Sequence, residues 1–267
     1  MKRIAIIGCG NIGSELSKAI DRGIVRAKLV ALYDIIIDKC TNIASTLSNE
    51  KPTVAGKFEE LLTLKPDIVV EAASQEAVRQ YGEQILLNGI DLVVLSVGAL
   101  LNDDIRKRLR EASHKTSARI YIPSGAIAGL DAIRALSVIG IDKIILRTRK
   151  PPKTLKGAPG AQDIELDKLT KPQVIFRGHA SKAVKLFPAN INVAATLTLM
   201  ANREPIVEII ADPTINKNIH EIIVESKASK IRIVVENNPS PSNPKTSYLA
   251  VLSVIELLRS ITSEHIF

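Results

Sequence analysis

A chain of 267 residues, 46% of them apolar, is long enough to bury a sizeable core as one large domain or two smaller ones. The net charge of +8 invites a nucleic-acid interpretation, but aromatic residues make up only 3% and no RNP, helix-turn-helix or zinc-ligand spacing occurs. We therefore expect neither a nucleic-acid partner nor a metal site. No apolar run is as long as a membrane span and no signal-peptide pattern occurs, which predicts a cytoplasmic protein with no membrane partner.

The chain begins with an apolar strand that runs directly into a glycine-rich turn and an amphipathic helix. Three glycines follow the strand with GxGxxG spacing. In such a turn the first glycine permits the tight bend, the second lets the backbone approach a pyrophosphate, and the third lets the helix pack on the strand. The helix N–H groups then face the anion. The predicted cofactor contacts in this turn are Gly8, Gly10, Asn11, Ile12 and Gly13.

An acidic residue closes the next apolar strand. Asp34 lies about 20 residues past the last glycine, where a carboxylate accepts hydrogen bonds from the ribose of an adenosine. Its charge repels a 2′-phosphate, so NAD is predicted as the cofactor, with NADP possible if Arg26 or Lys39 lies close enough to offset that charge. The alternative is a glycine turn in an α/β domain that binds no ligand.

Helices and strands keep alternating up to about residue 122. The predicted helices cover residues 39–49, 58–64, 76–88 and 103–114, and the predicted strands cover residues 67–70, 91–95 and 119–122. Alternation of this kind predicts an α/β protein with a Rossmann-type, doubly wound parallel sheet. A ligand crevice is then expected beyond the carboxyl ends of the strands, at the glycine turn and at residues 72–74, 96–99 and 124–126.

The pattern changes after Pro123. A helix over residues 130–138 is followed by strands over 143–149, 173–177, 206–211, 220–225 and 230–236, which predicts a second α/β domain with a mixed or antiparallel sheet. Residues 236–247 read as a turn-rich connector, and the apolar helix 248–261 is expected to return to the first domain. The expected domains are 1–122 with 245–267 for dinucleotide binding, and 123–244 for substrate binding and dimerisation.

One of the four histidines is singled out as a catalytic candidate. His220 opens a strand and shares a face with Ile222 and Val224. A histidine at a strand start is usually structural, but it titrates near neutrality and is the natural group for moving protons beside a hydride acceptor. His114 and His265 read as solvated residues, and His179 as either a turn residue or a cleft residue.

Four further segments, in matching order, resemble the motifs of the L-aspartate dehydrogenase family. They are IPSGAIAGLDAI (122–133), FPANINVAATL (187–197), ADPTINKNIHEI (211–222) and NPKTSYLAVLS (243–253). With the glycine turn they span nearly the whole chain. The resemblance implies an NAD(P)-dependent homodimer that oxidises L-aspartate, a dicarboxylic amino acid, to iminoaspartate. This product hydrolyses to oxaloacetate and ammonia or feeds quinolinate synthesis for NAD.

The resemblance also assigns residues. The family's catalytic histidine falls on His220, and its cofactor contacts outside the glycine turn fall on Ala126 and on the PxNxN run, where Asn190 and Asn192 both match. One departure is the apolar run 35–37 after Asp34, where related dehydrogenases show polar residues.

Two expectations leave alternatives open. Lys182 and Lys185 share a helix face and are candidates for holding a substrate carboxylate, against the alternative of a solvated basic face. For the activity, the alternatives are a relative of homoserine dehydrogenase or dihydrodipicolinate reductase, and a non-catalytic NAD-binding sensor.

Overall fold

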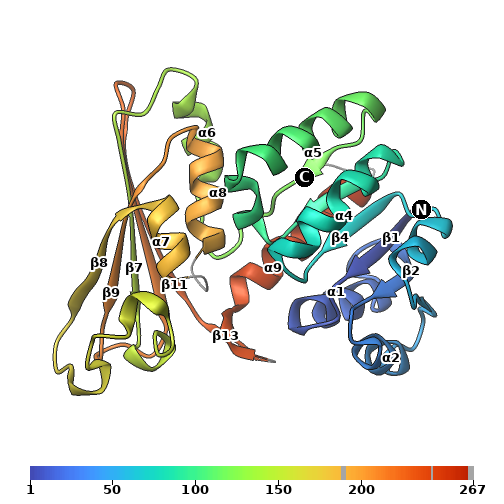
Figure 1. Cartoon of the computed structure of the whole chain (residues 1–267), viewed down its shortest axis with the longest axis horizontal. Coiled ribbons are helices and arrows are strands. Elements are labelled where there is room, and N and C mark those ends of the chain that lie inside the picture. Colours follow the sequence, from blue (N-terminus) through green and yellow to red (C-terminus); the bar gives the residue numbers. More distant parts are fainter. Residues whose placement is uncertain (188–190, 242, 264–267) are drawn as a thin grey trace. The chain divides into compact units, whose positions relative to one another are not determined.

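The computed structural model describes residues 1–187, 191–241 and 243–263. The chain divides into two compact units (Figure 1). Unit 1 comprises Met1–Pro123 and the chain from Val251 onward, and unit 2 comprises Ser124–Ala250. The sequence-based boundaries were placed at residues 122/123 and 244/245.

Unit 1 contains a six-stranded sheet in the order β3-β2-β1-β4-β5-β6, in which every pairing is parallel. Its strands are β1 (Lys2–Ile7), β2 (Ala27–Tyr33), β3 (Thr53–Val54), β4 (Ile68–Glu71), β5 (Asp91–Val94) and β6 (Ile120–Tyr121). Its helices are α1 (Asn11–Asp21), α2 (Ile37–Thr46), α3 (Phe58–Thr63), α4 (Gln75–Leu87), α5 (Asp103–Thr116) and, from Val251 onward, α9 (Tyr248–Thr262), with a 3₁₀ turn at Val97–Leu101.

Both faces of this sheet are covered, which explains why its strands are apolar throughout. Side chains of α1, α2 and α9 pack on one face, where Ile4 and Ile6 of β1 lie in a core with Leu16, Val254 and Leu258. Helix α4 packs against β4 and β5. The predicted Rossmann-type doubly wound sheet is confirmed.

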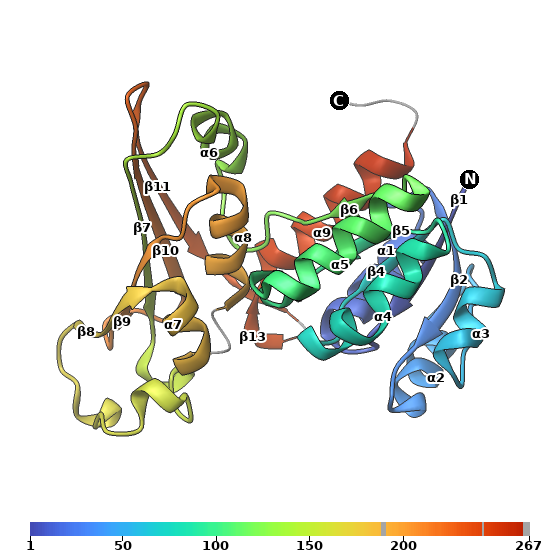
Figure 2. The same ribbon diagram turned by 45° about the horizontal axis from the view of Figure 1, so that its top comes forward.

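Unit 2 contains a five-stranded mixed sheet in the order β11-β10-β7-β9-β8. Its strands are β7 (Lys143–Lys150), β8 (Gln173–His179), β9 (Ile206–Ala211), β10 (Asn218–Glu225) and β11 (Lys230–Asn237), and only β7 and β9 pair in parallel. Helices α6 (Leu130–Ser137), α7 (Ala180–Leu186) and α8 (Ile191–Ala201) lie on the same side of this sheet (Figures 1 and 2). The predicted second α/β domain with a mixed sheet is confirmed.

Two elements of unit 2 differ from the sequence-based expectation. Helix α8 was not predicted, because its sequence INVAATLTLMA is apolar almost throughout and so lacks the 3.6-residue alternation that marks an amphipathic helix. The expected connector contains β12 (Pro239–Ser240) and β13 (Asn243–Ser247), which pair with each other. Pro, Asn and Ser are poor strand formers, so composition concealed this small sheet.

Candidate functional site

The glycine turn of unit 1 is so tight that only glycine fits at two of its positions. Gly8 has a φ of +100°, and a Cβ there would lie 2.6 Å from the backbone of Ala72 after β4. A Cβ on Gly13 would lie 2.0 Å from the carbonyl oxygen of Gly8. The turn is therefore held closely between α1 and the end of β4, as a pyrophosphate-binding turn requires.

The start of α1 has the features of an anion site. Gly10 is the N-cap, no side chain caps the helix, and its first turn carries no acidic residue. A Cβ on Gly10 would have no atom within 4 Å, so the backbone is open to a ligand on that side. Within the described residues the buried Nδ2 of Asn11 has no hydrogen-bond partner, whereas Ile12 packs against the core. Free amides and an unpartnered donor fit the pyrophosphate of a dinucleotide.

Asp34 follows β2 and is fixed in place by two backbone amides. Its Oδ2 accepts from Cys9 N of the glycine turn at 2.8 Å, and its Oδ1 accepts from Ile36 N at 2.9 Å. Each carboxylate oxygen has a second lone pair, which leaves capacity for ribose hydroxyls. Arg26 and Lys39 are exposed, and so is the apolar run that follows Asp34, in which the exposed fraction of Ile35 is 87%.

A buried carboxylate that sequence analysis missed connects two of the predicted crevice loops. Glu71 ends β4, and its Oε1 accepts from Ala73 N and Ser96 Oγ, while its Oε2 accepts from Ser96 N, all at 2.8–2.9 Å. Burial raises the pKa of Glu71 despite these bonds. The only signal in the sequence was an acid at the end of an apolar strand.

In unit 2, one end of the helix-covered sheet face is polar. Ile144 and Leu146 of β7 and Ile222 and Val224 of β10 are buried in the core of that face. Strand alternation continues the same face to a polar end formed by four buried side chains. We call these side chains the polar cluster: Thr148 and Lys150 of β7, His220 of β10 and Asn237 of β11.

His220 is buried, with an exposed fraction of 3%, and is oriented by the neighbouring strand. His220 pairs with Thr148 across the β10–β7 ladder, and Thr148 Oγ1 lies 3.0 Å from His220 Nδ1. Burial and the nearby charge of Lys150 lower the pKa of His220 to about 3. The ring is therefore neutral at physiological pH, with one nitrogen held by the threonine hydroxyl, which leaves Nε2 for a substrate.

The turn that leads towards His220 is fixed by a second buried carboxylate. Asp212 accepts from Thr214 N at 2.9 Å and Thr214 Oγ1 at 2.6 Å, and it pairs with Arg149 of β7. These bonds lower the pKa of Asp212 against the opposing effect of its burial. The ADPT motif thus acts as a rigid connection between β9 and β10, which sets the position of His220.

The other predicted residues of unit 2 fall in different places. The carbonyl of Ala126 accepts from Asn237 Nδ2 at 3.1 Å, so this predicted cofactor contact is bonded to the polar cluster. The other amide atom, Asn237 Oδ1, is buried and has no partner among the described residues. Asn192 is exposed on α8, and Lys182 and Lys185 are exposed on α7. Asn190 lies outside the described residues.

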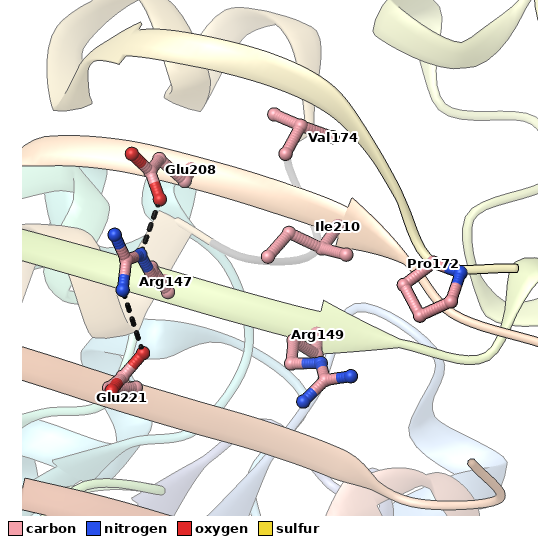
Figure 3. Close-up of a pocket in the computed structure, with 7 residues that line it drawn as sticks. All are labelled: Arg147, Arg149, Pro172, Val174, Glu208, Ile210 and Glu221. Carbon is pink, nitrogen blue, oxygen red and sulfur yellow. Dashed lines mark hydrogen bonds and ion pairs between the residues drawn. The ribbon is translucent and has the colours of Figure 1, made fainter. Parts of the chain in front are cut away.

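A pocket on the opposite face of the same sheet is structural rather than catalytic (Figure 3). Its charged side chains are already paired: Arg147 bonds both Glu208 and Glu221, and Arg149 pairs with Asp212. Glu221 lines this pocket and directly follows His220 in β10. Successive side chains of a strand point to opposite faces, so His220 points to the other face.

Across residues 1–187, 191–241 and 243–263 no helix is long and apolar enough to cross a membrane. No group of three potential metal-ligating side chains occurs in that same part of the chain.

The chain matches two family models, sequence relatives and a solved structure, and all of these except one of the family models are described as aspartate dehydrogenase. Residues 131–261 match the family described as aspartate dehydrogenase, C-terminal, and residues 8–123 match the homoserine dehydrogenase NAD binding domain. The chain is 46% identical to the L-aspartate dehydrogenase of Methanosarcina barkeri over 98% of both chains, and 47% identical to that of Methanosarcina mazei over 98% of this chain and 97% of the relative. A crystal structure of aspartate dehydrogenase from Thermotoga maritima has a TM-score of 0.78 at 30% identity, covering 100% of this chain and 99% of that one.

Proposed function

Because this chain belongs to the L-aspartate dehydrogenase family, we propose that it oxidises L-aspartate to iminoaspartate with NAD or NADP, and that iminoaspartate then hydrolyses to oxaloacetate and ammonia. The observation that carries the proposal is the buried, neutral His220 inside a polar cluster at the end of an otherwise apolar sheet face. A neutral imidazole has an unprotonated nitrogen, and an anionic substrate bound beside it would raise its pKa towards the range in which it can accept a proton.

Unit 1 binds the cofactor in this proposal. The amides at the start of α1, the open backbone at Gly10 and the side chain of Asn11 hold the pyrophosphate, and Asp34 binds the adenosine ribose. Ala126 and one asparagine of the PxNxN run, Asn190 or Asn192, complete the cofactor contacts. A nicotinamide cofactor held by these residues would supply the hydride-accepting chemistry for oxidation at the α-carbon of aspartate.

Unit 2 supplies the proton chemistry. The substrate ammonium must lose a proton before an iminium can form, and a water must then be activated to hydrolyse it. His220 accepts the proton at Nε2 in one or both steps, and in the second case the first proton must pass to solvent before the water is deprotonated. This role requires a hydrogen on Nδ1, donated to Thr148 Oγ1, 3.0 Å away. Thr148 is thus a positioning residue that holds the ring of His220 in this orientation.

The direct test replaces His220 with Asn and measures NADH formation from L-aspartate. A positioned general base supplies about 10²–10⁴-fold, so kcat is expected to fall by that factor while the Kd for NAD stays nearly unchanged. His179→Asn, at an exposed histidine in the same unit, is the control and should retain kcat. Wild-type kcat in the His220 variant would remove this residue from the mechanism.

The same assay separates the alternatives. Turnover of L-homoserine or a dihydropyridine dicarboxylate but not of L-aspartate would indicate a different dehydrogenase. NAD binding without turnover of any of these would indicate a sensor.

A second test concerns cofactor choice. If Asp34 binds the ribose hydroxyls, Asp34→Ala weakens NAD and improves NADP in relative terms, because the carboxylate that repels a 2′-phosphate is removed. The comparison requires kcat/KM for both cofactors. Asp38→Ala, at an exposed acid shortly beyond β2, is the matched control. An unchanged NAD to NADP ratio in the Asp34 variant would place this residue outside the adenosine site.

The proposal extends to the biological setting. Iminoaspartate made by this enzyme would feed quinolinate synthesis on the route to NAD, and a cytoplasmic location suits an enzyme that draws on the cell's NAD. A homodimer is the assembly that the family resemblance implies.

A further inference from the structure

One cation in unit 2 lacks the partner that its neighbours have. Strand β7 carries four cationic side chains, and three of them pair with carboxylates: Lys143 with Glu225, Arg147 with Glu208 and Glu221, and Arg149 with Asp212. The fourth, Lys150, has no carboxylate partner among the described residues, although only 7% of its surface is exposed. Burial alone lowers its pKa to about 8.

Such a lysine is costly to the fold. A buried ammonium is normally paired or hydrogen-bonded, because transfer out of water without compensation is strongly unfavourable. The three other cations on β7 all pair with carboxylates, so Lys150 is the exception on this strand. A cation left unpaired at one end of a buried face is instead suited to an anion that arrives from outside the protein.

The surroundings of Lys150 identify where that anion would lie. Lys150 is two residues beyond Thr148 on the same strand face, and Thr148 is both the ladder partner and the hydrogen-bond partner of His220. The charge of Lys150 acts on the His220 ring, which is a second sign that the two groups are close. An anion paired with Lys150 therefore lies beside the proposed base.

We propose that Lys150 binds one carboxylate of L-aspartate and so holds the substrate against His220. This assignment rests on the proposed function, because it takes its anion from the two carboxylates of that substrate. A charge-assisted bond in a buried site is strong and poorly screened by salt.

Two other lysines were candidates for binding a substrate carboxylate. Lys182 and Lys185 are exposed on α7, where water and salt screen their charges. Lys150 lies in the buried polar cluster that contains His220, and therefore we assign the carboxylate to Lys150 rather than to α7.

The experiment compares Lys150→Met, which keeps an unbranched buried chain without charge, with Lys143→Met at the far end of the same strand. Lys150→Met is expected to raise the KM for L-aspartate about 10- to 100-fold, the usual effect of losing a hydrogen bond to a charged group, while the KM for NAD stays nearly unchanged. Lys143→Met and the double variant Lys182→Met with Lys185→Met should keep both constants. Thermal unfolding of Lys150→Met at or above the wild-type Tm would show that the variant is folded.

A binding measurement makes the test independent of turnover. Succinate has two carboxylates but no amine, and calorimetry measures its binding to the protein in the presence of NADH. The proposal expects succinate binding to be lost in Lys150→Met and weakened less in Lys150→Arg. Parental constants for both L-aspartate and succinate in Lys150→Met would overturn it.

The outcomes also separate this assignment from the proposed function. If the parent protein failed to turn over L-aspartate, the proposed function would fail, and the succinate comparison would still decide whether Lys150 is a carboxylate ligand. Turnover of L-alanine distinguishes the two carboxylates. If Lys150→Met raises the KM for L-aspartate alone, Lys150 binds the side-chain carboxylate. If it raises the KM for both amino acids equally, Lys150 binds the α-carboxylate.

Discussion

Burial lowers the pKa of both His220 and Lys150, with opposite consequences for stability near pH 7: His220 is neutral, as burial favours, whereas Lys150 is a buried ammonium. An unfolded histidine titrates near pH 6.5, whereas burial and the Lys150 charge lower the folded pKa of His220 to about 3. Between those values the unfolded chain binds a proton that the folded chain does not. Stability contributed by the neutral ring is therefore complete above about pH 6.5 and is lost as the pH falls towards 3.

This linkage gives a measurable prediction for His220→Asn. Between pH 8 and pH 5 the wild-type protein should lose about 2 kcal/mol of unfolding free energy through this residue, and the variant should lack that contribution. Urea unfolding of both proteins at the two pH values measures the difference. Equal losses of unfolding free energy in the wild-type protein and in His220→Asn would mean that His220 is solvated in the folded chain.

For Lys150, replacement by a neutral residue is expected to increase the free energy of unfolding. Its folded pKa of about 8 lies below the unfolded value of 10.5, so the ammonium destabilises the folded state, fully below about pH 8 and not at all above about pH 10.5. Replacement by Met should therefore raise the free energy of unfolding at pH 7 by up to about 3 kcal/mol, even as aspartate binding is lost. Denaturant unfolding at pH 7 measures this gain. Lys143→Met, at an exposed ion pair, should change stability far less.

Some residues of the candidate site are predictable from the sequence and others are not, for a physical reason. Asp34 and the glycines stand at fixed spacings within one βαβ unit, so local pattern was enough to predict them. Lys150 and Asn237 become neighbours of His220 only through the pairing of three strands in unit 2. Their significance also depends on burial without a partner, which no spacing in the chain reveals.

At the scale of elements, the carboxyl ends of β4 and β5 depend on one side chain. Glu71 accepts three hydrogen bonds from the loops after these strands, and the glycine turn packs against the first of those loops at Ala72. In Glu71→Gln an amide NH₂ replaces one of the accepting oxygens and faces a donor.

The expected result is a loss of about 1–3 kcal/mol in the free energy of unfolding and a higher Kd for NAD, because the loops beside the glycine turn are released. Urea unfolding and a titration with NAD measure the two effects. Glu76→Gln, at an exposed ion pair on α4, is the control and should change neither. A Glu71 variant with unchanged NAD affinity would show that the loops keep their position without this carboxylate.

The elements themselves were predicted unevenly. The parallel strands of unit 1 are short apolar runs separated by amphipathic helices such as α1 and α5, and each transition is visible in the sequence. The order of strands in unit 2 was not predictable, because β7 and β9 are neighbours in the sheet although more than fifty residues separate them in the chain. Helix α8, which is apolar all round, carries no periodic signal.

At the scale of the whole molecule, the exposed face of the unit 2 sheet is where the proposed homodimer should form. Helices α6, α7 and α8 all cover the other face (Figure 2). On the exposed face Val174 of β8 and Val234 of β11 remain 53% and 52% exposed, beside the ion pairs of Arg147. A mixed surface of paired charges and exposed valines suits a self-complementary interface.

The corresponding prediction is that the chain of 29.0 kDa sediments as a dimer and that Val234→Lys shifts it towards the monomer. A lysine at this position would bury charge against the partner without a matching acid. Val138→Lys is the control, because Val138 is more exposed but follows α6 on the helix-covered side, and it should leave the mass unchanged. Sedimentation velocity across a range of protein concentrations measures the mass of the parent protein and of both variants. A dimer that survives Val234→Lys would place the interface on another surface, whereas a monomer in the parent protein would remove the homodimer from the proposed assembly.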